Sequence, residues 1–277
     1  MLEGEDSIIH KVTLRSQTFQ VDLTGDYYGK EYWNKISERL YEPDTVGFLE
    51  NRCDSDTQFF DIGAANGAMS FIAALKGAEV LAYEPDPTIY QVAKRNFELN
   101  PSLSSSIQLR NIALSSTRGR TIFGSSADST VLSSIVTAGR TNTPTKEIVI
   151  ESLVDEINRN HSDKNRKLIL KMDIEGAEWR IIQNVDCLET LEAHNALLLL
   201  AVHPGFYRPF IKFKFPINSI RYRIWQFRNF RESVSAFNAI SRNAKVMRTN
   251  LNPVNRSVVF AILIAAGYHE FIVDFRS

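Results

Sequence analysis

The chain has 277 residues, of which 44% are hydrophobic and 23% are charged, and this composition excludes a disordered chain. Its 32 basic residues balance its 32 acidic residues, so the net charge alone indicates neither a nucleic acid nor a membrane as a partner. Cys53 and Cys187 lack the spacing of a metal or redox site, so we expect two reduced thiols. The acidic N-terminus lacks the apolar core of a secretion signal, so we expect a cytoplasmic protein.

The first fifty residues, 1–50, predict an N-terminal extension to a larger domain that spans 51–277. Apolar residues alternate loosely over 12–23, as they do in a short hairpin or an edge strand. Further on, Trp33 and Ile36 have the spacing of one helical face. We therefore expect a hairpin and then a helix ahead of the main domain.

In the main domain, short apolar runs alternate with helical patterns, which predicts an α/β fold with a mostly parallel sheet and helices on both faces. The expected strands are 58–60, 79–83, 107–110, 167–172, 196–202 and 270–275. The expected helices are 68–76, 88–100, 152–160, 177–185 and 258–266. The stretch 115–145 is rich in Ser, Thr and Gly, and it predicts a loop with at most a hairpin.

The most informative motif is FFDIGAANG at 59–67, in which an apolar run ends in Asp61 and a small-residue loop opens a helix. The next apolar run ends in Glu84. Ligands of such folds bind beyond the carboxyl ends of the strands, where Glu84 is suited to the two hydroxyls of a ribose. Gly63 and Gly67 permit a tight turn and a close approach of the backbone to the ligand. Asn66 is either a turn residue or a ligand contact.

The composition of this loop favours S-adenosylmethionine over a dinucleotide. A dinucleotide site requires three glycines as G-x-G-x-x-G, whereas Gly63 and Gly67 are the two glycines here. Asp61 would repel a pyrophosphate, but it would attract the ammonium and sulfonium of S-adenosylmethionine.

A second group of acids follows the apolar strand 167–172. Asp173 and Glu175 come directly after this strand, at the ligand-binding end of the sheet, and we expect a direct role for Asp173 in the reaction. Two neighbouring carboxylates require a compensating cation, and Lys171 is expected to point to a neighbouring side. Glu178 fits the first turn of the following helix equally well as a structural residue.

His203 ends the fifth expected strand and also points toward the crevice. With Asp173 and Glu175 it forms the candidate catalytic set, whose members act as a base or orient the acceptor. The same three residues could hold a divalent cation, but three candidate ligands from two strands are a weak metal signal, and we predict no metal site.

The segment 205–256, called the basic segment below, contains eleven Lys or Arg residues and one acid, Glu232. Aromatic residues are interleaved with the basic ones, and a helical face is formed by Ile220, Ile224, Phe227, Val234, Phe237 and Ile240. This segment is either a solvated face, a lid over an anionic acceptor, or a peripheral contact with an anionic membrane. RNA is disfavoured because no RNA-binding signature is present.

The order of these motifs resembles that of FkbM-type methyltransferases over 41–203. The motifs that carry the resemblance are YEPDTVGFL, FFDIGAANG, YEPDPTIYQVAKRNFELN, RNIALSS, LKMDIEGAEWRII and the tail GYHEFIVDF. The resemblance implies a class I S-adenosylmethionine-dependent fold and O-methylation of a sugar, a glycan or a hydroxylated natural product. It further implies the following placements: Asp61, Gly63 and Gly67 in the methionine-side loop, Glu84 at the ribose, Asn111 near the adenine, and Asp173, Glu175 and Glu178 in the D-x-E-G-x-E signature.

The chain departs from the family pattern in two places. The usual D-S-L motif is Glu151-Ser152-Leu153, and the chain ends at Ser277 after the expected sixth strand. Class I sheets normally add a seventh, antiparallel strand, so we expect an unprotected sheet edge. The alternatives to an active methyltransferase are an inactive or truncated binding module and, less favoured, an NAD-dependent oxidoreductase.

Overall fold

The structure is a computed structural model that describes residues 8–26, 28–126, 129–134, 145–174, 177–202, 220–265, 268 and 270–276. Only the backbone is described for residues 123–126, 129–134, 145, 220–226 and 228. Glu175, His203 and residues 205–219 of the basic segment lie outside the described residues, so the roles expected of them stay predictions.

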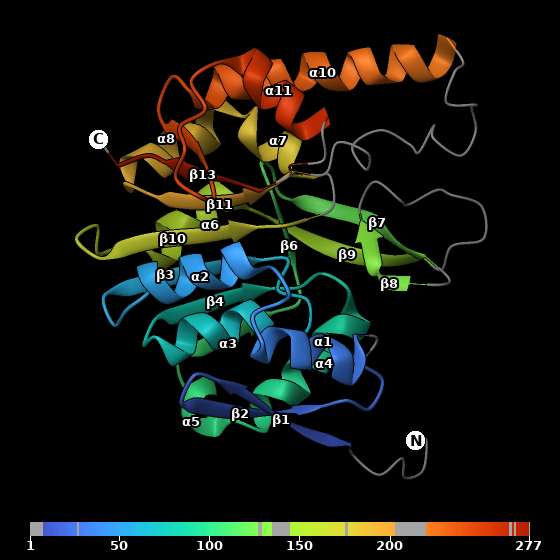
Figure 1. Cartoon of the computed structure of the whole chain (residues 1–277), viewed down its shortest axis with the longest axis vertical. Helices are drawn as coiled ribbons and strands as arrows, with labels where there is room; N and C mark the ends of the chain where they lie inside the picture. Colours follow the sequence, from blue (N-terminus) through green and yellow to red (C-terminus); the bar gives the residue numbers. More distant parts are fainter. Residues whose placement is uncertain are drawn as a thin grey trace.

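A seven-stranded sheet in the order β12-β13-β11-β10-β3-β4-β5 forms the centre of the molecule (Figure 1). Its strands are β3 (Thr57–Ile62), β4 (Glu79–Tyr83), β5 (Ile107–Arg110), β10 (Lys167–Met172), β11 (Leu197–Ala201), β12 (Lys245–Arg248) and β13 (Glu270–Asp274). β13 is antiparallel to both of its neighbours, and the other paired strands are parallel. The predicted fold class, a mostly parallel sheet in an α/β protein, is confirmed.

The strands are apolar on successive residues because each face of the sheet packs against its own core. Phe60 and Ile62 of β3 belong to one core, whereas Phe59 belongs to the other. Leu170 and Ile169 of β10 divide between the two cores in the same way. This alternation is what a parallel sheet covered by helices on both faces requires.

Helices from the two halves of the chain cover the two faces. The helices are α3 (Ala68–Leu75), α4 (Pro87–Glu98), α5 (Pro101–Ser104), α6 (Leu153–Asn160), α7 (Glu178–Ile182), α8 (Val185–Ala193), α10 (Ile220–Ile240) and α11 (Ser257–Ala265). Residues of α3 and α4 pack in one core, and residues of α6, α7, α8, α10 and α11 pack in the other. In the second core Phe260 of α11 lies between Phe237 of α10 and Phe271 of β13, with ring centroids 5.5 and 4.4 Å apart.

The N-terminal elements extend the α3 side of the molecule. They are the hairpin β1 (Ile9–Leu14) and β2 (Gln17–Asp22), followed by α1 (Gly29–Ser37) and α2 (Pro43–Arg52). Phe19 of the hairpin stacks on Phe71 of α3, with 4.4 Å between ring centroids. The hairpin and the first helix were predicted, but α2 was not recognised as a helix.

A second, four-stranded sheet lies beside the main one (Figure 1). Its strands, in the order β6-β9-β7-β8, are β6 (Ala113–Ser115), β7 (Gly119–Ser126), β8 (Ser129–Ser134) and β9 (Thr145–Ser152). Within the stretch 115–145, expected to be a loop that could contain a hairpin, β7 and β8 do form an antiparallel pair. The expectation was wrong in missing the larger sheet, because β7 also pairs with β9. These strands contain many polar and β-branched residues, so hydrophobic periodicity did not identify them as strands.

Three further expectations require correction. The missing antiparallel strand is present: it is β13, and the strand that escaped prediction is β12, inside the basic segment. The predicted helix 177–185 is two short helices, α7 and α8. Phe227 does not belong to the buried face of α10, because 63% of its surface is exposed, whereas Phe237 and Ile240 are buried.

Candidate functional site

The loop between β3 and α3 turns on two glycines with positive φ, 86° at Gly63 and 90° at Gly67. A Cβ on Gly63 would lie 2.1 Å from the carbonyl oxygen of Asp173, and one on Gly67 would lie 2.6 Å from the ring of Phe97. The tight turn expected at these glycines is present, and the space next to each is filled by the protein itself. The expected close approach of the backbone to a ligand stays a prediction. Their requirement therefore comes from backbone conformation and from packing of the loop against its neighbours.

Asp61 stands at the end of β3 and is fully buried. Its Oδ2 accepts a hydrogen bond from Ser70 Oγ at 2.6 Å, whereas Oδ1 accepts none from any residue that the structure describes. Burial raises the pKa of Asp61, and the nearby Lys171 acts in the opposite direction. A buried carboxylate oxygen with spare acceptor capacity is suited to a ligand that brings a positive charge or a donor.

Glu84 stands at the end of β4, the neighbouring strand, and is also buried. Its Oε2 accepts from the backbone N–H of Ala65 at 3.0 Å and its Oε1 from that of Asp86 at 2.8 Å. Burial raises the pKa of Glu84 to about 8, against the effect of these two hydrogen bonds. The ionised form offers about four acceptor sites, so two ribose hydroxyls that donate to Glu84 would favour that form, in which each oxygen can still accept.

Two asparagines flank this carboxylate. Asn111 Nδ2 donates to the carbonyl oxygens of Glu84 and Pro85, at 2.8 and 3.1 Å, and so holds the turn that follows β4. The Asn66 side chain is buried in the loop after β3, and its backbone oxygen accepts from Asn96 Nδ2 at 3.0 Å. Both therefore lie at the carboxyl ends of the strands, and a contact of either with a ligand stays a prediction.

A small polar cavity of about 50 Å³ opens beside this loop. It is lined by Tyr28, Tyr32, Tyr41, Glu42, Asp61, Gly63, Ala64, Ala65, Ala68, Met69, Lys171 and Asp173. The three tyrosines and Glu42 come from the N-terminal region, and no spacing within the sequence placed them at the site. The motif YEPDTVGFL contains Tyr41 and Glu42, and it was the one signal that could have identified them.

Lys171 is the cation that the neighbouring carboxylates require. Its Nζ lies 3.2 Å from Asp173 Oδ2, so the expectation that it points away was wrong. The Lys171 side chain is almost fully buried, and burial alone would lower its pKa. Asp173, Glu42 and Asp61 outweigh that effect and raise the pKa of Lys171 above its ordinary value. Lys171 is therefore a permanent ammonium near neutral pH.

Carboxylates outnumber this cation. Asp61, Asp173 and Glu42 surround Lys171, and Glu270 of β13 interacts with the same group. Burial raises the pKa of Glu270 to about 7, and Glu42 adds to the effect. Burial likewise raises the pKa of Glu42, opposed by Lys171. A site with this excess of buried carboxylates favours a ligand that is itself cationic.

Glu178 has a structural position. It is buried in the first turn of α7, and its Oε1 accepts from the backbone N–H of Ile174 at 3.0 Å. This hydrogen bond holds the chain just after Asp173, as the structural alternative for Glu178 predicted. Within the part of the chain that the structure describes, no group of three His, Cys, Asp or Glu side chains is arranged to hold a metal ion. Nor is any described helix both long and apolar enough to cross a membrane.

Comparisons with known proteins show which family this chain resembles. The model of the Methyltransferase FkbM domain matches residues 61–232, which is more than half of the chain. An uncharacterised protein of Methanocaldococcus jannaschii is 40% identical over 52 residues, which are 19% of this chain and 20% of that protein. This chain thus spans about a fifth of the length of that relative.

Solved structures of methyltransferases are also similar. The FkbM methyltransferase of Methylobacillus flagellatus KT is 17% identical, with a TM-score of 0.37, over 63% of this chain and 45% of that one. Geranyl diphosphate C-methyltransferase of Streptomyces coelicolor A3(2) is 10% identical, with a TM-score of 0.38, over 91% of this chain and 82% of that one. The assignment to a family rests on the domain match alone.

Proposed function

This chain belongs to the FkbM methyltransferase family, and we propose that it methylates a hydroxyl oxygen of a sugar, a glycan or a hydroxylated natural product. The domain match supports methyl transfer as the reaction, and the proposal includes S-adenosylmethionine as the methyl donor. The hydroxyl acceptor is the finer part of the proposal. The observation that carries it is the Lys171–Asp173 pair on the wall of the tyrosine-lined cavity, next to Asp61.

The residues present suit the donor. Asp61 has a buried carboxylate oxygen without a partner among the described residues, and Glu84 has acceptor capacity left on both oxygens. In this proposal Asp61 attracts the cationic methionine end, and Glu84 holds the two ribose hydroxyls. The excess of carboxylates over Lys171 makes the same region favourable for positive charge. When bound, S-adenosylmethionine supplies a methyl group on a positively charged sulfur.

Asp173 is the group that we propose as the base. Its carboxylate accepts the proton of the acceptor hydroxyl, which leaves the oxygen free to react. Lys171 holds the Asp173 side chain in place through the ion pair between Lys171 Nζ and Asp173 Oδ2. The hydroxyls of the surrounding tyrosines can hydrogen-bond to further oxygens of the acceptor, as a polyhydroxylated substrate requires. Burial raises the pKa of Tyr28 and of Tyr41, so both stay protonated donors.

The test is a turnover assay with labelled S-adenosylmethionine and a panel of glycans and hydroxylated compounds. Asp173→Asn should lower turnover roughly a hundredfold or more, the usual size of a general-base contribution, with little change in donor affinity. The exposed Asp163→Asn is the matched control. If Asp173→Asn keeps full turnover on a true substrate, Asp173 is structural and the proposed mechanism is wrong.

Two predicted catalytic residues, Glu175 and His203, belong in the same assay. Glu175→Gln and His203→Asn report whether the base lies on one of them instead of on Asp173. EDTA in the assay tests the alternative of a divalent cation, because removal of a required metal abolishes turnover. Turnover that EDTA leaves unchanged excludes that alternative.

A further inference from the structure

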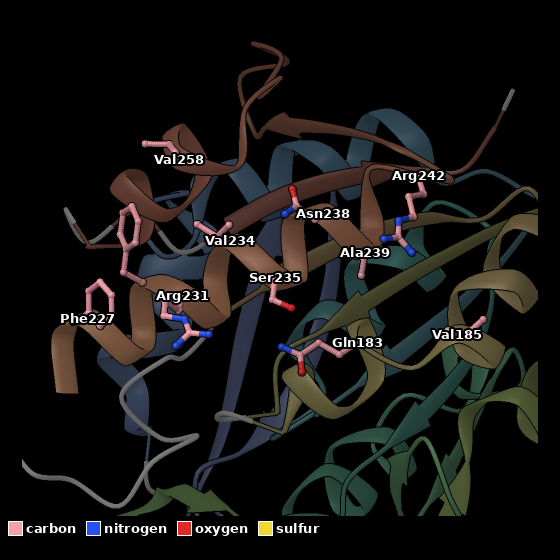
Figure 2. A pocket seen from close by; sticks show the side chains of 11 residues that line it. Gln183, Val185, Phe227, Arg231, Val234, Ser235, Asn238, Ala239, Arg242 and Val258 are labelled. Atoms are coloured by element: carbon pink, nitrogen blue, oxygen red, sulfur yellow. The ribbon is translucent and has the colours of Figure 1, made fainter. Parts of the chain in front are cut away.

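A large groove lies on the side of the molecule formed by α7, α8, α10 and α11, away from the polar cavity. Its volume is about 700 Å³, within the range of ligand-binding clefts. It is lined by Gln183, Val185, Phe227, Phe230, Arg231, Val234, Ser235, Asn238, Ala239, Arg242 and Val258. Figure 2 shows these side chains along α10, with Val258 of α11 above them and Gln183 and Val185 below.

The apolar part of this face is exposed. Phe227 is 63% exposed and Val185 is 61% exposed, whereas Phe237 and Ile240 on the other face of α10 are buried. Exposed apolar side chains of this size are stabilised when another surface covers them, so this part of α10 is suited to binding a partner surface.

Helix α11 has no polar face. Its sequence SVVFAILIA contains no charged residue, and Phe260, Ala261 and Ile264 form its buried side. The opposite side is apolar as well: Val258, Val259 and Ile262 are 50%, 43% and 54% exposed. A helix that is hydrophobic all round is normally covered on every side by protein or lipid.

The charged residues that line this face have one sign. Arg231 and Arg242 belong to the lining, and no described lining residue is acidic. Arg256, directly before α11, is exposed as well. Figure 2 places Arg231 next to Phe227 and Arg242 toward the other end of the exposed face. Arginines that border exposed Phe, Val and Ile residues match a surface that is both apolar and anionic.

We infer that this face, formed by Phe227, Arg231, Arg242, Val258, Val259 and Ile262, binds the surface of an anionic phospholipid bilayer. The apolar side chains of α10 and α11 enter the boundary between headgroups and acyl chains, and the arginines pair with lipid phosphates. From the sequence, the basic segment was a solvated face, a lid over an anionic acceptor or a peripheral membrane contact. In the structure α11, which follows that segment, also contributes to the proposed face. The face therefore consists of residues from two helices, whereas the sequence suggested one side of a single helix.

The test uses sedimentation of the full chain with phosphatidylcholine vesicles that either contain or lack phosphatidylglycerol. We expect binding to the anionic vesicles, and we expect it to weaken as the Debye length falls from about 10 Å at 0.1 M salt to about 3 Å at 1 M. Arg231→Gln with Arg242→Gln should weaken binding roughly thirtyfold, because each arginine near the surface contributes about fivefold. Phe227→Ser with Ile262→Ser should weaken it about tenfold through lost apolar contact.

Matched variants on another exposed surface distinguish vesicle binding at this face from non-specific adsorption of the protein. Arg120→Gln removes an exposed arginine of β7, and Ile122→Ser removes an exposed apolar residue of the same strand, so both should bind vesicles like the parent. The inference is overturned if the parent ignores anionic vesicles, if it binds neutral ones equally well, or if the α10 and α11 variants bind like the parent. A concentration-dependent dimer that these variants abolish, without vesicle binding, would overturn it too and assign the face to a second copy of the chain.

Discussion

Gly63 and Gly29 make a controlled comparison, because both have positive φ but different surroundings. Their φ angles are 86° and 63°, and an added Cβ meets Asp173 O at 2.1 Å in the first case and nothing within 4 Å in the second. A left-handed conformation costs a non-glycine residue about 1–2 kcal/mol, and this cost is common to both positions. Any further loss at Gly63 therefore reports the close packing of the loop against Asp173.

We expect Gly29→Ala to lower the free energy of unfolding by about 1–2 kcal/mol and Gly63→Ala to lower it by roughly 1–3 kcal/mol more. Urea denaturation measures both values. Donor affinity should fall in Gly63→Ala alone, because the clash displaces the loop that carries the site. Equal losses of stability in the two variants would show that the contact with Asp173 relaxes without cost.

Asp61 and Glu84 carry the proposed contacts with the donor. A charge-assisted hydrogen bond is worth about 1.5–3 kcal/mol, so Asp61→Asn and Glu84→Ala should each weaken S-adenosylmethionine binding roughly ten- to a hundredfold. Calorimetry with S-adenosylmethionine and its demethylated product measures this effect, with Asp163→Asn as the control. Binding of NAD, with none of the other two ligands, would contradict the assignment of both residues.

Both carboxylates could be found from the sequence because each directly follows an apolar strand, and parallel strands bring their carboxyl ends together. Lys171 was misjudged, although residues two apart in a strand share a face and alternation therefore places Lys171 on the same side of β10 as Asp173. Its ammonium reaches Asp173, two residues further along the chain. Tyr28 and Tyr32 could not be placed, because only tertiary packing brings this part of the N-terminal region to the cavity.

At the scale of elements, a pair of buried histidines joins the C-terminal ends of α6 and α8. His161 and His194 are the C-cap residues of these helices, and their Nδ1 atoms lie 2.9 Å apart. The carbonyl oxygen of Arg166, 3.1 Å from His161 Nε2, can only accept, so His161 carries its proton on Nε2. His194 Nδ1 then donates to His161 Nδ1, and the pair is neutral. Asn158 Oδ1 is placed 3.2 Å from His194 Nε2. Since Nε2 can only accept in the neutral pair, the Asn158 amide satisfies it when its Nδ2, in place of Oδ1, faces the ring.

An additional proton on this pair would set two N–H groups against each other. Burial lowers the pKa of His161, and burial together with His161 lowers that of His194 to about 4. The ordinary pKa of a histidine is 6.5, so above pH 6.5 both histidines are neutral in the folded and in the unfolded protein. The contribution of the pair to the free energy of unfolding is fully present in that range. As the pH falls from 6.5 toward 4, the unfolded chain takes up protons first and stability is lost.

We therefore predict that His194→Gln has a weaker dependence of unfolding free energy on pH between 6.5 and 4 than the parent. The difference in slope is bounded by about 1.4 kcal/mol per pH unit for each proton. Denaturant unfolding at a series of pH values measures it, and His10→Gln, outside the pair, should leave the slope unchanged. Identical slopes in the parent and in His194→Gln would mean that the pair titrates alike in both states.

The elements that the sequence identified are those with strong local signals. The ranges expected for β4, β5 and β10 are those observed. β4 and β10 are buried strands with apolar residues in succession, whereas β5 (IQLR) is short, only partly buried and alternates apolar with polar residues. β12 was missed because it has only four residues, two of them basic, at the edge of the sheet. Its place is determined by pairing with β13, more than twenty residues later, and this pairing has no local signal in the chain.

At the scale of the whole molecule, the two cores share the strands of one sheet. Phe59 and Phe60, adjacent in β3, belong to different cores, so neither core can open without exposing the other side of the same strand. The hairpin and α1 contribute Phe19 and Trp33 to the core that contains α3. We therefore expect residues 8–52 and the main domain to unfold together.

Phe19→Ala tests this coupling. Phe19 is 2% exposed, stacks on Phe71 and meets Trp33 edge to face at 6.0 Å. Its truncation should cost about 3–5 kcal/mol, the usual range for a buried Phe. For a chain of this size that corresponds to a fall in Tm of roughly 10 °C.

The shape of the transition decides the question. If the N-terminal elements and the sheet are one cooperative unit, near- and far-ultraviolet circular dichroism will give one coincident transition in Phe19→Ala, shifted as a whole. Leu40→Ala, at a position 67% exposed in the same region, should stay within about 0.5 kcal/mol of the parent. Two separate transitions in Phe19→Ala would instead identify residues 8–52 as an independently unfolding unit. Tyr28, Tyr32 and Glu42 of that unit line the cavity beside Asp61. Measuring donor binding across the same unfolding transitions therefore shows whether loss of residues 8–52 from the fold also abolishes binding of the donor.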